Sequence, residues 1–212
     1  FKRGGIGRLY GATGCRLMVR HDRIETRDSD HIALKPAVLW SFKHVFSFRS
    51  RSMRLTLVRH GHARRSLDAT LPDDARVLSE TGRDAVRATA ATLAAEGIQP
   101  DTVWSSPLTR ALQTAELLLA GLENAVPVEV LSCLEPDGDI GELLARLSEL
   151  PDDTDLLLTS HAPLANRLTS ILTSLTGTHA GKADALRMEL EKAEPGAAKL
   201  LWHWQSKTQR KR

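Results

Sequence analysis

The stretch Leu55-Thr56-Leu57-Val58-Arg59-His60-Gly61-His62 decides the fold of this chain. Its first half is a brief aliphatic run, which is typical of a strand buried on both faces of a parallel sheet. Because such sheets bind ligands at the carboxyl ends of their strands, Arg59 and His60 stand where a site would form. Gly61 would let the backbone turn sharply or approach a ligand closely. An ordinary polar loop is the alternative for this stretch alone, but a cation beside an imidazole here suggests an anion site with a nucleophile.

The rest of the chain alternates between helix-like and strand-like segments. The periodicity predicts helices at 80–96, 107–121, 140–150 and 163–175, and further strands at 102–105, 126–131 and 155–159. Ser79 and Ser106-Pro107 are the start signals of the first two helices. Alternation over 186–204 predicts a hairpin with one buried face and with Arg187 among the residues of its other face. We therefore predict an α/β fold: a three-layer α/β/α sandwich with a mostly parallel sheet, a C-terminal β-hairpin and no lid domain.

Charge divides the 212 residues unevenly. The formal net charge is +3, but residues 1–52 hold eleven Lys/Arg against four Asp/Glu, and the remainder holds eighteen against twenty-two. The basic segment shows no regular periodicity, although 37–48 is apolar and aromatic. We predict a poorly ordered basic N-terminal extension at 1–52, with Met53 as the start of the natural protein. A folded domain at 53–205 and a basic C-terminal tail at 206–212 complete this division.

Composition narrows the cellular setting. No apolar run approaches the ~18 residues that span a bilayer, and the first residues lack the apolar stretch of a signal peptide. Cys15 and Cys133 form neither a metal-binding spacing nor a CxxC pair, which favours reduced thiols. We expect a cytoplasmic protein without a membrane partner. Because the basic residues of 1–52 are scattered, we expect no nucleic-acid partner either.

Three predicted strands are followed by arginine or histidine residues, which have basic side chains. Arg59 and His60 follow the first strand, Arg110 lies one turn inside the helix after the second, and His161 follows the strand at 155–159. All three ends would face one crevice, where the partial positive charge of a helix N-terminus also favours anions. Taken alone, Arg110 would be interpreted as a solvated helix residue and His161 as a capped loop histidine. Together they predict a phosphate pocket around a histidine nucleophile.

The residues of these strand ends resemble those of a known family. Three motifs are similar to the histidine phosphatase (phosphoglycerate mutase-like) superfamily over about residues 53–205: Leu57-Val58-Arg59-His60-Gly61, Ser105-Ser106-Pro107-Leu108 with Arg110, and Ser160-His161. The short length, Ala63 after the first motif and the turn from Glu135 to Asp139 most resemble the small SixA-type phosphohistidine phosphatases. The resemblance implies that His60 becomes phosphorylated and that Arg59, Arg110 and His161 hold the phosphoryl oxygens.

The proton donor is the least defined part of this prediction. Family members that act on phosphate esters use an acidic residue, and Glu135 is the positional candidate, although Pro136 and Gly138 also indicate a plain turn. His62 is an alternative donor, or lines the phosphate pocket together with Gly61. We expect no metal and no cofactor, because arginines supply the charge that magnesium would and the sequence shows no Asp cluster.

The substrate is predicted from the leaving group. Imidazole, with a pKa near ~6.5, is expelled far more easily than an alkoxide, so a site without a strong acid suits a phosphoramidate. Short connections leave the site open to a phosphorylated protein. We predict a phosphatase that works through phosphorylated His60, and its favoured substrate is a phosphohistidine carrier protein. The alternatives are a small-molecule phosphate-ester phosphatase or mutase, and a non-catalytic phosphate-binding adaptor; a metal site of His60, His62 and His161 is opposed by the two arginines.

Overall fold

The computed structural model describes residues 52–64 and 72–211, and within these residues strand β1 (Met53–Arg59) lies inside a seven-stranded mixed sheet. Its aliphatic residues are fully buried, as expected for a strand covered on both faces: Leu55, Leu57 and Val58. The sheet order is β3-β2-β4-β1-β5-β6-β7. The predicted extension at 1–52 lies outside the described residues except for Ser52, whose hydroxyl donates to Glu189 Oε1 at 2.7 Å.

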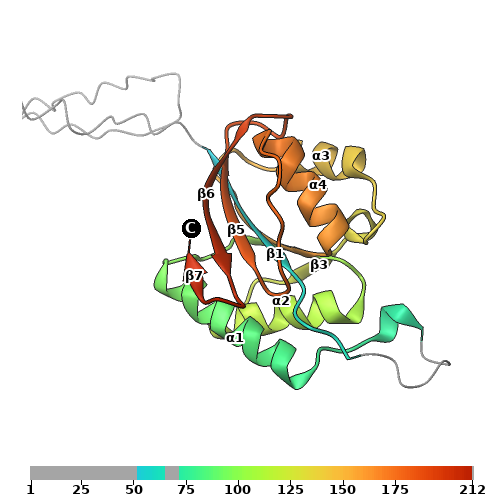
Figure 1. The fold of residues 1–212 in the computed structure, drawn as a ribbon. Helices are drawn as coiled ribbons and strands as arrows, with labels where there is room; N and C mark the ends of the chain where they lie inside the picture. Colours follow the sequence, from blue (N-terminus) through green and yellow to red (C-terminus); the bar gives the residue numbers. More distant parts are fainter. Residues whose placement is uncertain (1–51, 65–71, 212) are drawn as a thin grey trace, which may run out of the picture. The chain divides into compact units, whose positions relative to one another are not determined.

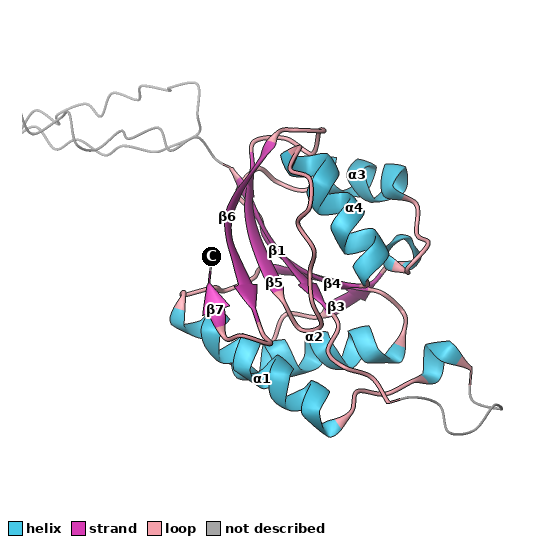
Figure 2. Cartoon of the chain, in the orientation of Figure 1, coloured by secondary structure: helices cyan, strands magenta, loops and turns pink. Residues whose placement is uncertain are grey.

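The sheet has a parallel half and an antiparallel half. Its other strands are β2 (Thr102–Ser105), β3 (Val128–Val130), β4 (Asp155–Ser160), β5 (Ala185–Leu190), β6 (Ala198–Gln205) and β7 (Arg210–Lys211). β1, β2, β3 and β4 run parallel, whereas β5 pairs antiparallel with β1 and the remaining pairings are also antiparallel (Figure 2). The predicted α/β sandwich is confirmed, but the sheet is mixed rather than mostly parallel, because the hairpin strands and β7 extend it.

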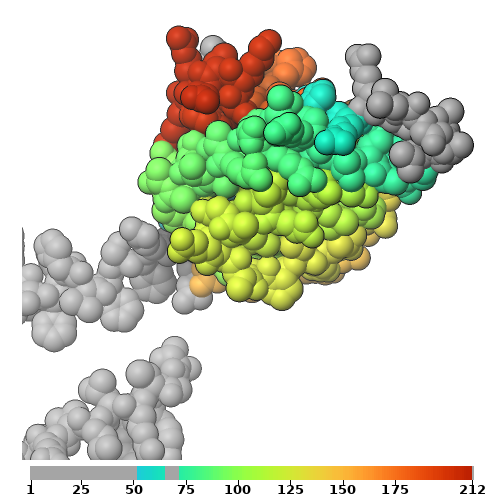
Figure 3. Space-filling view, turned by 90° about the horizontal axis from the view of Figure 1, so that it is seen from below, coloured from blue at the N-terminus to red at the C-terminus, as the bar shows by residue number. Residues whose placement is uncertain are grey.

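Helices cover both faces of the sheet. They are α1 (Glu80–Ala95), α2 (Thr109–Gly121), α3 (Ile140–Ser148) and α4 (Ala162–Thr173), with short 3-10 turns η3 (Asp73–Ala75) and η4 (Ser132–Leu134). α3 and α4 pack on the core that contains Leu55 and Leu57, and α1 and α2 pack on the core that contains Val58 (Figure 1). Seen from below, α1 and α2 lie side by side over their face (Figure 3). Successive β1 side chains point to opposite faces, so this strand contributes to both cores.

Local capping explains the starts of α1 and α3 and the end of α4. The hydroxyl of Ser79 accepts from Gly82 N at the start of α1, and the carboxylate of Asp139 accepts from Gly141 N at the start of α3. α4 ends at Thr173, two residues before the predicted end, and its C-cap residue Ser174 has a φ of 55°, in the left-handed region. None of the described helices is long and apolar enough to cross a membrane.

The start of α2 differs from the prediction. The helix begins at Thr109 rather than at Pro107, and its N-cap residue, Leu108, provides no side-chain cap. Ser106 does not cap the helix, because its hydroxyl lies 2.9 Å from Nε2 of His161 and accepts from the amide of Leu108 at 3.3 Å. The serine that signalled a helix start therefore belongs to the strand-end region.

The C-terminal hairpin also differs in which residues it buries. β5 and β6 pair as predicted, but Arg187 is 3% exposed rather than on an open face. β5 lies between β1 and β6, and the guanidinium of Arg187 is neutralised by the carboxylate of Asp155, with nitrogen–oxygen distances of 2.7 and 2.6 Å. The predicted tail at 206–212 contains β7, which pairs with β6 and places Lys211 Nζ 5.2 Å from the ring centroid of Trp202.

Candidate active site

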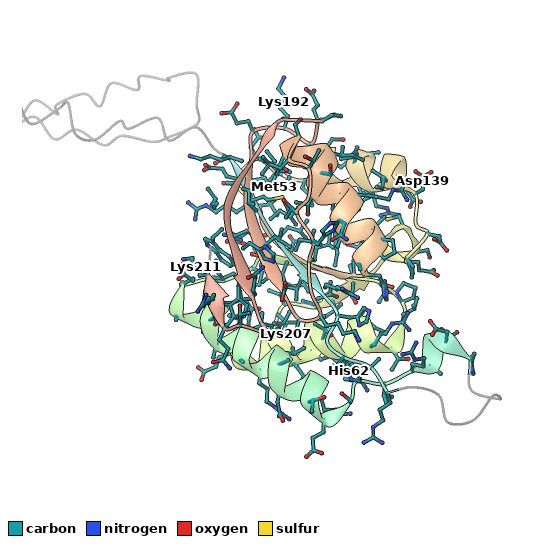
Figure 4. All side chains as sticks on the ribbon, viewed as in Figure 1. Met53, His62, Asp139, Lys192, Lys207 and Lys211 are labelled. Carbon is teal, nitrogen blue, oxygen red and sulfur yellow. The ribbon has the colours of Figure 1, made fainter. Side chains whose placement is uncertain are left out.

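The carboxyl ends of β1, β4 and β2 lie next to one another at one edge of the sheet. Arg59 is paired with Ser160 across β1 and β4, and Ser105 is paired with Thr159 across β2 and β4. The residue after each of these strands therefore emerges into the same region, as the parallel topology requires. Figure 4 labels Met53 at the start of β1 and His62 just beyond its opposite end, near α1 and α2.

His60 is held in one protonation state and one orientation. Its amide donates to Ser160 O at 2.9 Å, and its ring Nδ1 lies 2.7 Å from the carbonyl oxygen of Gly61. Because a carbonyl only accepts, Nδ1 carries the proton and Nε2 keeps its lone pair. The pKa of His60 is lowered to about 4, chiefly by burial and also by the charges of Arg110, Arg59 and Lys182, against the opposing effect of the Gly61 bond. At neutral pH this imidazole is therefore uncharged, with an unprotonated Nε2.

His161 faces His60 across the site. It precedes α4 as its N-cap residue, is 2% exposed, and its ring centroid lies 4.9 Å from that of His60. Burial, followed by the nearby His60 and Arg110, lowers the pKa of His161 to about 3. Its Nε2 lies 2.9 Å from Ser106 Oγ, whereas Nδ1 is buried without a hydrogen-bond partner among the described residues. An unpartnered buried ring nitrogen is costly unless a ligand completes its bonding.

Arg59 ends β1 on the other side of His60. One terminal nitrogen, Nη1, donates to the carbonyl oxygen of Ala180 at 2.9 Å, while Nε is buried with no partner in the described part of the chain. Desolvation lowers the pKa of Arg59, and the carboxylate of Asp184 opposes this shift. The arginine is thus anchored at one nitrogen and has a further donor left for an anion.

Arg110 is the second residue of α2 and is 5% exposed. Both terminal nitrogens contact one residue that the sequence did not single out: Nη1 donates to Asp73 O at 2.7 Å and Nη2 to Asp73 Oδ2 at 2.9 Å. Asp73 belongs to η3, and its side chain is 62% exposed. The hydrogen bond from Arg76 and the charge of Arg110 lower the pKa of Asp73, so it is a carboxylate at neutral pH. The terminal nitrogens of Arg110, which were predicted to bind phosphate, are therefore bonded to Asp73 in this structure.

Gly61 is required here for packing rather than for a turn. A Cβ at this position would lie 2.8 Å from Gly82 O and 2.9 Å from Cγ2 of Val86, so a side chain would push β1 away from α1. Its amide donates to Thr114 Oγ1 at 3.2 Å. The predicted role of Gly61 in binding phosphate stays a prediction. Close packing against α1 is a separate reason why a glycine is needed at this position.

His62 is exposed, and its Nδ1 lies 2.8 Å from the hydroxyl of Ser79, the N-cap of α1. Glu135, the predicted acid, follows Leu134, whose carbonyl oxygen accepts from Ser160 Oγ at 2.8 Å, so its backbone lies near the end of β4. No hydrogen bond joins the carboxylate of Glu135 or the ring of His62 to His60 within residues 52–64 and 72–211. Both roles stay predictions.

A metal would need a different set of side chains. Within residues 52–64 and 72–211, no group of three or more His, Cys, Asp or Glu residues could hold a metal ion. Cys133, the cysteine inside the described region, is a buried free thiol whose pKa is raised by burial. The region around His60 instead combines two guanidinium groups, two neutral imidazoles and the start of α4. This chemistry fits a tetrahedral oxyanion placed against Nε2 of His60.

Known proteins of similar sequence and structure share this arrangement of elements. The family model of the histidine phosphatase superfamily (branch 1) matches residues 55–136. The phosphohistidine phosphatase SixA of Escherichia coli (strain K12) is 35% identical over 122 residues, which are 57% of this chain and 74% of that protein.

Solved structures extend the comparison to the fold. A protein histidine phosphatase SixA complexed with tungstate has a TM-score of 0.67 and 29% identity, covering 74% of this chain and 100% of that chain. A putative alpha-ribazole-5'-P phosphatase from Escherichia coli has a TM-score of 0.57 at 20% identity, covering 70% and 94%, and shares the fold alone. By these matches, the chain belongs to the histidine phosphatase superfamily, and within that superfamily it is similar to SixA.

Proposed function

We propose that this protein removes phosphate from phosphohistidine on another protein, through a phosphorylated His60. The observation that carries the proposal is the state of His60: a neutral ring with Nδ1–H donated to Gly61 O and with the Nε2 lone pair beside His161, Arg59 and Arg110. A histidine locked in this tautomer can attack phosphorus without first losing a proton.

The reaction consists of two phosphoryl transfers. In the first, Nε2 of His60 forms a bond to phosphorus while the bond from phosphorus to the substrate imidazole breaks. The substrate ring carries a proton from solvent on its other nitrogen, so it keeps the electron pair of the broken bond and leaves as a neutral imidazole. In the second, water attacks the phosphorus on His60, releasing inorganic phosphate and returning the ring to its neutral state. Each step passes through a loose transition state with charge on three equatorial oxygens, so positioned donors supply most of the catalysis.

The donors around His60 fit these oxygens by number and chemistry. Arg59 offers its buried Nε, and His161 offers its unpartnered ring nitrogen. Arg110 offers both terminal nitrogens once an oxyanion takes the place of the Asp73 carboxylate, since both anions bind a guanidinium in the same way. The scheme requires no metal.

The leaving group distinguishes a phosphoramidate from an ester. Asp73, the carboxylate in contact with Arg110, is ionised at neutral pH and is a poor proton donor. An alkoxide that leaves from an ester needs a good proton donor. An imidazole does not, because the pKa of imidazole is near ~6.5. The likeness to SixA, a phosphohistidine phosphatase at 35% identity, supports the same substrate class.

Relative turnover of two substrates tests the proposal. One is a histidine-bearing carrier protein phosphorylated with phosphoramidate, and the other is glycerol 2-phosphate, an alkyl ester. We expect kcat/KM on the carrier to exceed that on the ester by more than a hundredfold, and His62→Ala to keep this ratio. Faster ester turnover that is lost in Glu135→Gln would contradict the proposal, and would assign Glu135 as the acid of an ester phosphatase.

A further inference from the structure

The hydroxyl of Ser106 is fully buried and has two neighbours of different kinds. The amide of Leu108 donates to Ser106 Oγ at 3.3 Å, and Nε2 of His161 lies 2.9 Å from the same oxygen. Since the Leu108 amide is a donor, it uses an oxygen lone pair and leaves the hydroxyl hydrogen for another acceptor. The other contact of this oxygen within the described residues is His161 Nε2, which is an acceptor when it carries no proton.

A hydroxyl hydrogen donated to Nε2 places the single proton of His161 on the other nitrogen. The ring is neutral at physiological pH, because burial and the neighbouring cations lower its pKa to about 3. A neutral imidazole has one N–H, and the Ser106 hydroxyl selects which nitrogen holds it. That nitrogen, Nδ1, is the buried atom without a partner in the described part of the chain.

We infer that Ser106 is a positioning residue: its hydroxyl donates to His161 Nε2 and so fixes the tautomer in which Nδ1–H of His161 points at a phosphoryl oxygen. The inference rests on the proposed function and adds to it the origin of a donor opposite His60. In the other tautomer Nδ1 would present a lone pair to a negatively charged oxygen, which repels it. The signal was present in the sequence as Ser105-Ser106-Pro107, but there it resembled an ordinary helix start.

Nitrogen-15 NMR of the full-length protein with labelled histidines measures the tautomer directly, since protonated and unprotonated ring nitrogens differ widely in chemical shift. His161→Gln identifies the His161 signals. We expect the wild-type ring to be protonated on Nδ1 and the Ser106→Ala ring to lose this preference. A wild-type ring protonated on Nε2, or an unchanged spectrum in Ser106→Ala, would overturn the inference.

Turnover of the phosphorylated carrier protein gives a second readout. Ser106→Ala should lower kcat/KM about tenfold, the effect of one neutral hydrogen bond. The matched control is Ser160→Ala, which also removes a buried hydroxyl, but one that donates to Leu134 O at 2.8 Å rather than to an imidazole. Equal losses in the two variants would contradict a specific role for Ser106.

The two measurements separate failure of the inference from failure of the proposed function, because the tautomer is observed without turnover. An Nδ1-protonated His161 in a protein that never phosphorylates His60 would refute the function and leave the tautomer established. A phosphorylated His60 beside an Nε2-protonated His161 would do the reverse.

Discussion

Arg110 and Arg187 are both buried arginines, 5% and 3% exposed, yet their surroundings are built differently. Arg187, in the middle of the sheet, donates to both carboxylate oxygens of Asp155 and to the hydroxyl of Thr56 at 2.6 Å. The carboxylate of Asp155 is itself mostly buried, at 19% exposed. Arg110, at the strand ends, has as its partner Asp73, whose side chain is 62% exposed.

The difference lies in how easily each partner can be replaced. Asp155 is fixed within β4, so its ion pair with Arg187 is part of the packed interior. Asp73 belongs to a three-residue 3-10 turn and is largely in water, so moving it away from Arg110 costs little. A buried cation with a buried partner serves the fold, whereas a buried cation with an exposed partner is available to a ligand.

The largest expected effect on turnover is that of His60→Ala. Because the proposed scheme depends on a bond between Nε2 and phosphorus, this variant should have no measurable activity on the phosphorylated carrier protein while keeping its thermal unfolding temperature. His179→Ala is the control and should retain activity, since this histidine is exposed and its ring lies near Asn166. Substantial turnover by His60→Ala would break the covalent scheme.

Arg187→Ala should act on stability instead. It leaves the Asp155 carboxylate without its partner, which costs about 3–5 kcal/mol in the free energy of unfolding. Chemical denaturation measures this loss, and the activity per folded molecule should stay near that of the wild type. A variant as stable as the wild type would show that this ion pair contributes nothing net to the fold.

Arg110→Ala should give the opposite pattern. We expect about a hundredfold loss of kcat/KM, corresponding to about 3 kcal/mol of transition-state stabilisation, with a smaller loss of stability than Arg187→Ala. Measuring both quantities on both variants tests the contrast itself. If each arginine reduced activity and stability in equal proportion, the distinction between a structural and a ligand-binding arginine would fail.

The pH dependence of His60 tests the electrostatics of the strand ends. With a pKa of about 4, the ring should stay neutral from pH 7 down to pH 5, where an ordinary histidine would be almost fully protonated and about thirtyfold less available as a nucleophile. NMR titration of the His60 ring, assigned with His60→Ala, should show a midpoint near pH 4.

The same shift has a consequence for stability. The unfolded chain binds a proton near pH 6.5 that folded His60 does not accept until about pH 4, so stability should be lost as pH falls through this interval. Arg110→Ala should raise the midpoint of His60, because a nearby positive charge is removed. A wild-type midpoint near 6.5 would contradict the burial of this ring.

Asp73→Asn should have the smallest effect. Removing its negative charge leaves Arg110 more available, so inhibition by inorganic phosphate should tighten by about two- to fivefold, the scale of an exposed ion pair. The control is Asp74→Asn, which removes the same charge from the same short turn. Unchanged inhibition by phosphate in Asp73→Asn would show that the carboxylate does not compete for Arg110.

The sequence predicted those features that depend on local periodicity. The short aliphatic runs identified β1 and β4, the cap Ser79 matches the start of α1, and the parallel pairing of β1 to β4 followed from the alternation of strands and helices. It also identified the residues that the structure brings together at the strand ends, because each stands immediately after a buried strand or one turn into a helix.

Contacts between distant residues could not be read from periodicity. Asp73 stands in a polar segment 37 residues before Arg110, and nothing local marks it as a partner of that arginine. Arg187 fits the exposed face of an alternating strand, and only the neighbouring Asp155 makes its burial possible. Ser106 gave a helix-start signal that its bond to His161 overrides. In each case a long-range polar contact decided the outcome.

The most direct test of the account is to find where the phosphoryl group goes. The wild-type protein is mixed with the phosphohistidine-bearing carrier protein and quenched in base within milliseconds, and the phosphorylated residue is mapped by mass spectrometry. We predict phosphate on His60 that forms and decays at the rate of turnover, and none in His60→Ala. Release of phosphate without any label on His60, or a label on another residue, would contradict the account.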